Sequence, residues 1–201
     1  NKSINFSLQA TEIDKLTDYG YKTDKFGFSL GTDFEFLSDL NVGVATSSFY
    51  EKIETNSSAS ARQKKLAGNY WDTFLRFNFD YDKRNQFYQT TDGFRSRYFL
   101  DLPVISDTNT LTNTYDYKVF TELFEQNVST ASFFIKTANS ISNDDIKLSE
   151  RLNIPSSKLR GFERGKVGPK DGNDYIGGNY ISAVNFTSTI PQILENAQNV
   201  D

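Results

Sequence analysis

The chain has 201 residues, 15% of them aromatic, a formal net charge of −4 and no cysteine, methionine or histidine. The missing cysteine and histidine remove the usual ligands of a structural zinc site and the side chains of a Ser-His-Asp or Cys-His nucleophile, so hydrolases of those types are excluded. The acidic balance provides no general attraction for nucleic acid, and no apolar run approaches the roughly 18 residues that a membrane-spanning helix needs.

Alternating apolar and polar residues predict three strands at the start of the chain. Residues 3–10 place Ile, Phe, Leu and Ala at even positions and polar residues at odd ones. Residues 25–36, KFGFSLGTDFEF, follow the same rule more strictly, and residues 42–50 follow it more weakly. A period of two places one face of each strand against an apolar environment and the other against water.

The middle of the chain continues this pattern after a polar segment at 53–68, which predicts a long solvated loop. A strand at 71–82 carries Trp71 and Tyr81 at the two ends of its apolar face, where a membrane barrel places its aromatic girdles. A turn is predicted at Thr91, Asp92 and Gly93. Further strands are predicted at 94–104, 114–124, 129–138 and 178–190, and a long loop at 139–177 precedes the last of them.

The strand lengths favour a membrane barrel over a soluble sandwich, which also alternates. Sandwich strands are usually five or six residues long, whereas a tilted strand needs about 9–11 residues to cross a bilayer. The connections alternate roughly between long and short, and the polar faces carry charged residues as a water-filled lumen would. We therefore predict an all-β fold, an antiparallel transmembrane β-barrel with about eight meander strands in this chain.

The long loop carries three motifs in a fixed order. They are LRGF at Leu159, Arg160, Gly161 and Phe162, then Gly168-Pro169, then IGGN at Ile176, Gly177, Gly178 and Asn179. Together with the upstream Thr-Asp-Gly turn, they resemble the sixth extracellular loop of the bacterial outer-membrane assembly factors, the surface-antigen family. Residues 77–104 are similar to the strands and turn that lie upstream in that family, so the resemblance covers nearly the whole chain.

The resemblance implies that residues 1–201 are the central part of a sixteen-stranded barrel, preceded by POTRA domains. The POTRA domains and the first and last barrel strands would then be absent from this sequence. An internal piece is also expected because the chain starts at Asn1 and has no recognisable signal peptide. A physical argument agrees, since eight strands closed on themselves leave no room for a loop of nearly forty residues.

The function implied by the resemblance is non-enzymatic. Members of the family fold and insert β-barrel proteins into the bacterial outer membrane and need no cofactor, metal or nucleotide. The implied partners are outer-membrane lipids, unfolded β-barrel client proteins and, through the absent POTRA domains, accessory lipoproteins. Arg160 would reach acidic residues on later strands inside the lumen, with Gly161 turning the backbone closely and Phe162 against the wall. Arg164 is expected to be solvated.

Two alternatives remain open at the level of sequence. One is a related translocation-assembly or two-partner secretion transporter, which shares the Arg-Gly loop. The other is a small self-contained porin or adhesin barrel. Catalysis is not indicated, because the carboxylates recur on every polar strand face without forming a distinct acid-base pair. These carboxylates are Asp33, Glu35, Asp80, Asp101 and Glu122.

Overall fold

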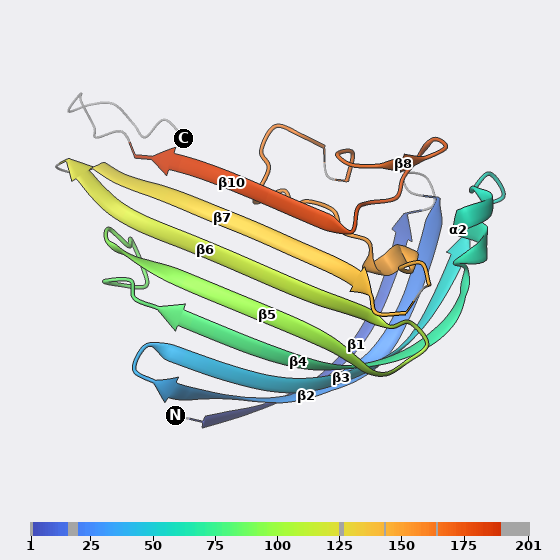
Figure 1. Ribbon diagram of the computed structural model, residues 1–201, viewed down its shortest axis with the longest axis horizontal. Helices are drawn as coiled ribbons and strands as arrows, with labels where there is room; N and C mark the ends of the chain where they lie inside the picture. Colours follow the sequence, from blue (N-terminus) through green and yellow to red (C-terminus); the bar gives the residue numbers. More distant parts are fainter. Residues whose placement is uncertain (1, 16–19, 125–126, 143, 164, 190–201) are drawn as a thin grey trace.

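The fold is a single curled antiparallel sheet, seen in a computed structural model that describes residues 2–15, 20–124, 127–142, 144–163 and 165–189. Its eight strands pair in the order β1-β2-β3-β4-β5-β6-β7-β10 (Figure 1). They are β1 (Lys2–Lys15), β2 (Tyr21–Leu37), β3 (Leu40–Thr55), β4 (Gly68–Asp82), β5 (Gly93–Ser106), β6 (Thr110–Phe124), β7 (Asn127–Ser140) and β10 (Tyr180–Ser188). The predicted all-β meander is confirmed.

The sheet forms an open trough. Over the described ranges β1 pairs only with β2 and β10 only with β7, so the sheet has two edges that are not joined to each other. The remaining elements are short: helix α2 (Ala61–Lys65), the 3-10 helix η1 (Leu148–Glu150), and a hairpin of β8 (Lys170–Asp171) and β9 (Asp174–Tyr175). No helix in the described part of the chain is long and apolar enough to cross a membrane.

The outer face of the trough is apolar and aromatic, as the alternation predicts. In β2 the even-numbered Phe26, Phe28 and Leu30 are exposed, whereas Gly27 is buried on the opposite face. Other large apolar side chains exposed on this face are Ile4, Phe6, Leu8, Tyr50, Trp71, Phe79, Phe133, Tyr180, Val184 and Phe186. An apolar surface that extends across every strand is typical of a barrel wall that contacts lipid.

The inner face carries charged residues that pair across neighbouring strands. The guanidinium of Arg76 on β4 donates two hydrogen bonds to Asp101 on β5, at 2.5 and 2.9 Å. Arg95 on β5 binds Asp80 on β4 in the same two-pronged way, at 2.9 and 2.5 Å. The strand register places such residues opposite or diagonal to one another, where opposite charges stabilise a sheet.

The buried core lies at one rim, between the inner face and the segment that follows β7. One cluster contains Tyr21, Ile53, Leu66 and Leu148, and a second contains Ala138, Ile146 and Leu152. Figure 1 shows this rim at the right, where α2 and β8 lie. The chain therefore buries its apolar residues against its own loop, not against a second sheet.

The structure corrects two details of the sequence prediction. The segment 53–68 is not one solvated loop, because β3 continues to Thr55, α2 follows and β4 begins at Gly68. Helix α2 has a capping box in which Ser60 and Gln63 exchange hydrogen bonds. The alternation of loop lengths is also imperfect, since residues 107–109 join β5 to β6 at the long-loop rim and residues 83–92 join β4 to β5 at the other. The predicted end of the last strand at Ile190 lies outside the described residues.

Candidate functional site

The candidate site is the long loop, residues 141–179, which connects β7 to β10 and folds over the concave face of the sheet (Figure 1). The predicted boundaries 139–177 are close to these, although β7 extends to Ser140 and the loop contains η1, β8 and β9. Two lysines in the loop form ion pairs with carboxylates on the inner wall. Their positions decide how the loop is held.

Lys147 is the more deeply buried of the two. Its side chain is 2% exposed, and its ammonium forms ion pairs with Asp72 on β4 and with Glu51 on β3, the latter at 3.0 Å. A third carboxylate, that of Glu150, lies 3.3 Å away within η1. The ammonium also lies 5.5 Å from the ring centre of Tyr70, within the range of a cation–π contact.

The electrostatics of this cluster keep Lys147 charged. Burial alone would lower the pKa of Lys147, but the three surrounding carboxylates outweigh it and raise that pKa above its usual value. Burial also raises the pKa of the Glu150 carboxyl, an effect that the nearby Lys147 opposes. A buried charge that is paired and hydrogen-bonded on several sides fixes the position of its backbone, so Lys147 anchors the loop.

Further hydrogen bonds complete the anchor. The hydroxyl of Ser149 donates to Glu51 at 3.0 Å. Asp72 also accepts from the backbone N–H and the hydroxyl of Thr108, at 3.1 and 3.0 Å. The carboxylates that hold Lys147 are thus themselves positioned, which limits the ways in which the cluster can rearrange.

Helix α2 attaches to the same loop on its exposed side. Arg62 donates to both oxygens of Asp145, at 3.0 and 2.7 Å. This bond lowers the pKa of the Asp145 carboxyl, with burial acting weakly in the opposite direction. Because both side chains are about half exposed, the pair contributes little stability and serves mainly to orient the loop next to α2.

Lys158 forms the second contact between the loop and the wall. Its ammonium lies 3.0 and 2.9 Å from the two carboxylate oxygens of Asp116 on β6. Asp116 also accepts from Arg97 on β5 at 2.9 Å, and the ring of Phe134 lies beneath the ammonium at 5.1 Å. Lys158 immediately precedes the Leu-Arg-Gly-Phe motif, so this contact positions the motif over the lumen side of the sheet.

The motif itself makes few contacts with the wall. Arg160 is exposed and forms no hydrogen bond or ion pair with the described residues. Gly161 has a left-handed φ of 81°, and Phe162 is 61% exposed. Leu159 is partly buried. Arg164 lies outside the described residues.

The Gly-Pro and Ile-Gly-Gly-Asn motifs meet at the base of the β8–β9 hairpin. The backbone N–H of Ile176 donates to the carbonyl of Pro169, the residue after Gly168, at 3.2 Å. Gly178 and Leu152 exchange two backbone hydrogen bonds of 2.9 and 2.8 Å. The carbonyl of Asn179 then accepts from Ala138 on β7 at 2.8 Å, which starts the pairing of β10 with β7.

The amide side chain of Asn85 bonds to the Thr-Asp-Gly turn, in addition to the backbone hydrogen bond from the Asn85 N–H to the Asp92 carbonyl. Asn85 accepts from the backbone N–H groups of Thr91 and Asp92, at 3.2 and 3.3 Å, and donates to the Thr91 hydroxyl at 2.7 Å. Gly93 follows with φ of 97°. This turn lies at the rim opposite the long loop, so the structure does not bring it near the other motifs.

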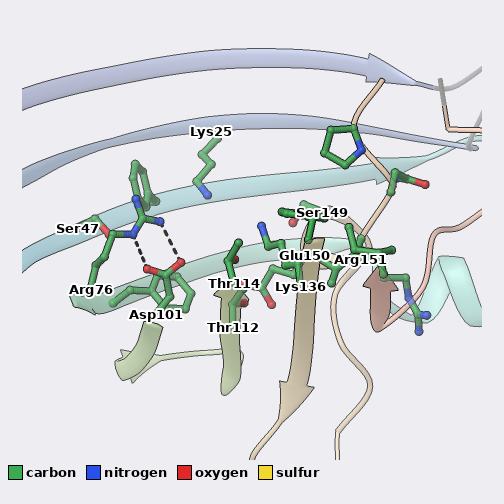
Figure 2. Close-up of a pocket in the computed structure, with 17 residues that line it drawn as sticks. Lys25, Ser47, Arg76, Asp101, Thr112, Thr114, Lys136, Ser149, Glu150 and Arg151 are labelled. Carbon is green, nitrogen blue, oxygen red and sulfur yellow. Dashed lines mark hydrogen bonds and ion pairs between the residues drawn. The ribbon is translucent and has the colours of Figure 1, made fainter. Parts of the chain in front are cut away.

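A cavity of about 540 Å³ lies between the loop and the inner wall (Figure 2). Its wall side includes Lys25, Arg76, Asp101 and Lys136, and its loop side includes Ser149. Figure 2 shows the Arg76–Asp101 pair within this lining.

Sequence reasoning missed the two lysines that hold the loop. Lys147 and its partners Asp72 and Glu51 are far apart in the chain, 75 residues in the case of Asp72, so no local motif links them. The sequence offered one signal for this anchor: the alternation places Glu51 and Asp72 on the inward face of their strands. Lys158 was similarly hidden among several charged residues of the loop.

Gly177 provides a first prediction. Its φ is 75°, and a Cβ added there would lie 2.9 Å from the Leu152 carbonyl oxygen. Gly177→Ala should therefore cost roughly 1–2 kcal/mol for the left-handed backbone and more for the overlap. Gly172→Ala is the matched control, because φ there is 63° but no atom lies within 4 Å of the added carbon. Thermal unfolding and protease cleavage of the loop should show the larger loss for Gly177→Ala, and equal losses would contradict the packing described here.

These features define a class of protein. An antiparallel meander with long strands, an apolar aromatic outer face, a charged inner face and a loop folded over the inner face forms the wall of a transmembrane β-barrel. The family model of the Omp85 superfamily domain matches residues 1–199. The chain belongs to the Omp85 superfamily, a superfamily of β-barrel outer-membrane proteins.

The comparison with solved structures agrees on the fold. The chain is similar to the crystal structure of BamA from Haemophilus ducreyi lacking POTRA domains 1-3, with a TM-score of 0.85 and 16% sequence identity. The match covers 98% of this chain and 43% of that chain, so this chain spans less than half the length of the BamA chain. The fold is that of a BamA-type barrel fragment. The search of curated proteins found no match.

Proposed function

We propose that the protein is an assembly factor that folds and inserts β-barrel proteins into the bacterial outer membrane. The observation that carries this proposal is the long loop held on the inner wall by Lys147 and Lys158, with Leu159–Phe162 carried over the lumen side. The motif resemblance and membership of the Omp85 superfamily support it. The proposed action requires no catalytic residue, cofactor or metal.

The proposed organisation places residues 1–201 in the middle of a larger barrel. The two free edges of the sheet, at β1 and β10, would each pair with a further strand of the same protein. The outer face would contact outer-membrane lipids, and unfolded β-barrel proteins would be the clients. Accessory lipoproteins would bind through POTRA domains that lie outside these residues.

Arg160 provides the second prediction, which rests on this organisation. In the proposed complete barrel, its guanidinium reaches acidic side chains on strands beyond residue 201, which accounts for its lack of a partner in the described ranges. Arg160→Ala should then cost about 3–5 kcal/mol if the pair is buried, and much less if water reaches it. Arg160→Lys should restore only part of the loss, because an ammonium cannot form a two-pronged contact.

The control is Lys65→Ala, which removes an exposed cation from α2 at the same rim. Protease sensitivity of the loop and heat-modifiable gel mobility of the full-length protein would be compared among the variants. Should Arg160→Ala and Lys65→Ala have the same effect, the proposed role of Arg160 would be wrong.

The proposed function is tested by depletion of the protein from its own cells. Loss of an assembly factor should lower the levels of many unrelated outer-membrane β-barrel proteins. The second candidate, a translocation-assembly or two-partner secretion transporter of the same superfamily, predicts that only its own substrate is retained while other barrels stay normal. Unchanged levels of all barrel proteins would contradict the assembly proposal.

A further inference from the structure

In the lining of the cavity beneath the long loop, the acidic side chains are paired with cations, whereas two of the basic side chains form no ion pair. Asp101 is already occupied, because Arg76 donates to both of its carboxylate oxygens. Glu150, the other acidic residue of the lining, is paired with Lys147 at 3.3 Å. Both carboxylates are thus engaged by other cations.

Two lysines on the wall are not engaged in this way. Lys25 on β2 and Lys136 on β7 line the cavity, and neither forms an ion pair or hydrogen bond with the described residues. Lys25 has only a ring contact, with its ammonium 4.3 Å from the centre of Phe49. Figure 2 shows both side chains directed toward the same space.

The surroundings of these ammonium groups suit an anion. The hydroxyls of Ser47, Thr112 and Thr114 belong to the same lining and are able to donate hydrogen bonds. The loop covers one side of the cavity, so an ion pair formed there would be less screened than one on an open surface. Partly buried cations that form no ion pair are favourable partners for carboxylate or phosphate oxygens.

We propose that this cavity binds an anionic group, a carboxylate or a phosphate, between the ammonium groups of Lys25 and Lys136. The site adjoins the Lys147 anchor, whose Ser149 and Glu150 also line the cavity, but its lining includes neither Lys147 nor the Leu-Arg-Gly-Phe motif. Anion binding there goes beyond the proposed assembly function. The anion has two possible sources. One is an acidic side chain of the same protein outside the described residues, and the other is a phosphate group from solution.

The test uses the purified full-length protein in detergent micelles and inorganic phosphate as the probe. Thermal unfolding is followed in potassium phosphate and in potassium chloride of equal ionic strength. Phosphate should raise the melting temperature more than chloride does, because it binds the folded state. In Lys136→Met and Lys25→Met, the phosphate concentration that gives half the shift should rise about tenfold or more.

Two further variants make each outcome decisive. Lys118→Met removes an inward-facing lysine near the other rim, which stacks on Phe120, and should leave the phosphate effect unchanged. A second outcome is that phosphate has no effect. In that case, the protein's own carboxylate fills the site if Lys136→Met lowers the melting temperature and Lys136→Arg does not. The proposal is overturned if phosphate acts equally on all variants. It is also overturned if phosphate has no effect and Lys136→Met is as stable as the unmodified protein or more stable.

Discussion

Lys147→Met should release the long loop from the inner wall of the sheet. Methionine keeps a similar apolar stem but leaves Glu51, Asp72 and Glu150 together in a buried site without their cation. Removing one partner of a buried ion pair costs about 3–5 kcal/mol, because the remaining charges are uncompensated. We expect a large fall in the melting temperature of the full-length protein and rapid cleavage of the loop by added protease.

Two variants control for this result. Lys52→Met removes an exposed lysine of β3 that is paired with Glu54, and should change stability little, because solvent screens such a pair. Adding Asp72→Asn to Lys147→Met should recover part of the loss, since one fewer charge is left without a partner. If Lys147→Met and Lys52→Met are equally mild, the anchor does not hold the loop.

Gly93→Ala should disrupt the connection between β4 and β5. Gly93 has a φ of 97°, and an added Cβ would lie 2.1 Å from the backbone oxygen of Lys83, which leaves no space for it. The left-handed backbone costs roughly 1–2 kcal/mol and the overlap roughly 1–3 kcal/mol, so the total is about 2–5 kcal/mol. The strain falls next to the hydrogen bond from the backbone N–H of Lys83 to the Phe94 carbonyl, which is 2.8 Å long. The pairing of β4 with β5 is therefore weakened at this end.

The neighbouring residue offers a matched control for Gly93→Ala. Asp92 is exposed, and it contributes to the turn through its backbone. Its N–H donates to the Asn85 side chain, and its carbonyl accepts from the Asn85 backbone N–H at 3.1 Å. Asp92→Ala should therefore change stability by no more than about 0.5 kcal/mol. Heat-modifiable gel mobility would report the fraction of folded barrel for each variant. Equal folded fractions for Gly93→Ala and Asp92→Ala would show that the turn tolerates a side chain.

The central parts of the strands could be predicted from the sequence because burial imposes a period of two. In β2 the side chains of Phe26 and Phe28 face outward and Gly27 faces inward, as the alternation indicates. The strand ends at the loop rim were underestimated for a physical reason. Around Lys22 and Asp24, polar residues occupy both faces, so no hydrophobic alternation marks the strand, although it continues to pair with its neighbours there.

Features that depend on distant contacts could not be predicted in the same way. Helix α2 has only five residues, and its one local signal was the pairing of Ser60 with Gln63. The anchor at Lys147 exists only once the fold brings β3 and β4 beneath the loop. The motif residues were located by resemblance. The structure places Ile176–Asn179 in contact with Pro169. Arg160 has no partner among the described residues.

A cross-link between the long loop and the inner wall of the sheet directly measures whether the loop is held there. The 201 residues contain no cysteine, so only introduced thiols in this region would react. A short thiol-reactive cross-linker should join Lys158→Cys to Asp116→Cys in the full-length protein in membranes, because these side chains are in contact. It should not join Lys158→Cys to Tyr117→Cys, the next residue of the same strand, which faces the opposite side of the sheet. Equal yields for the two pairs, or no product with Asp116→Cys, would show that the loop is not held against the inner wall at Asp116.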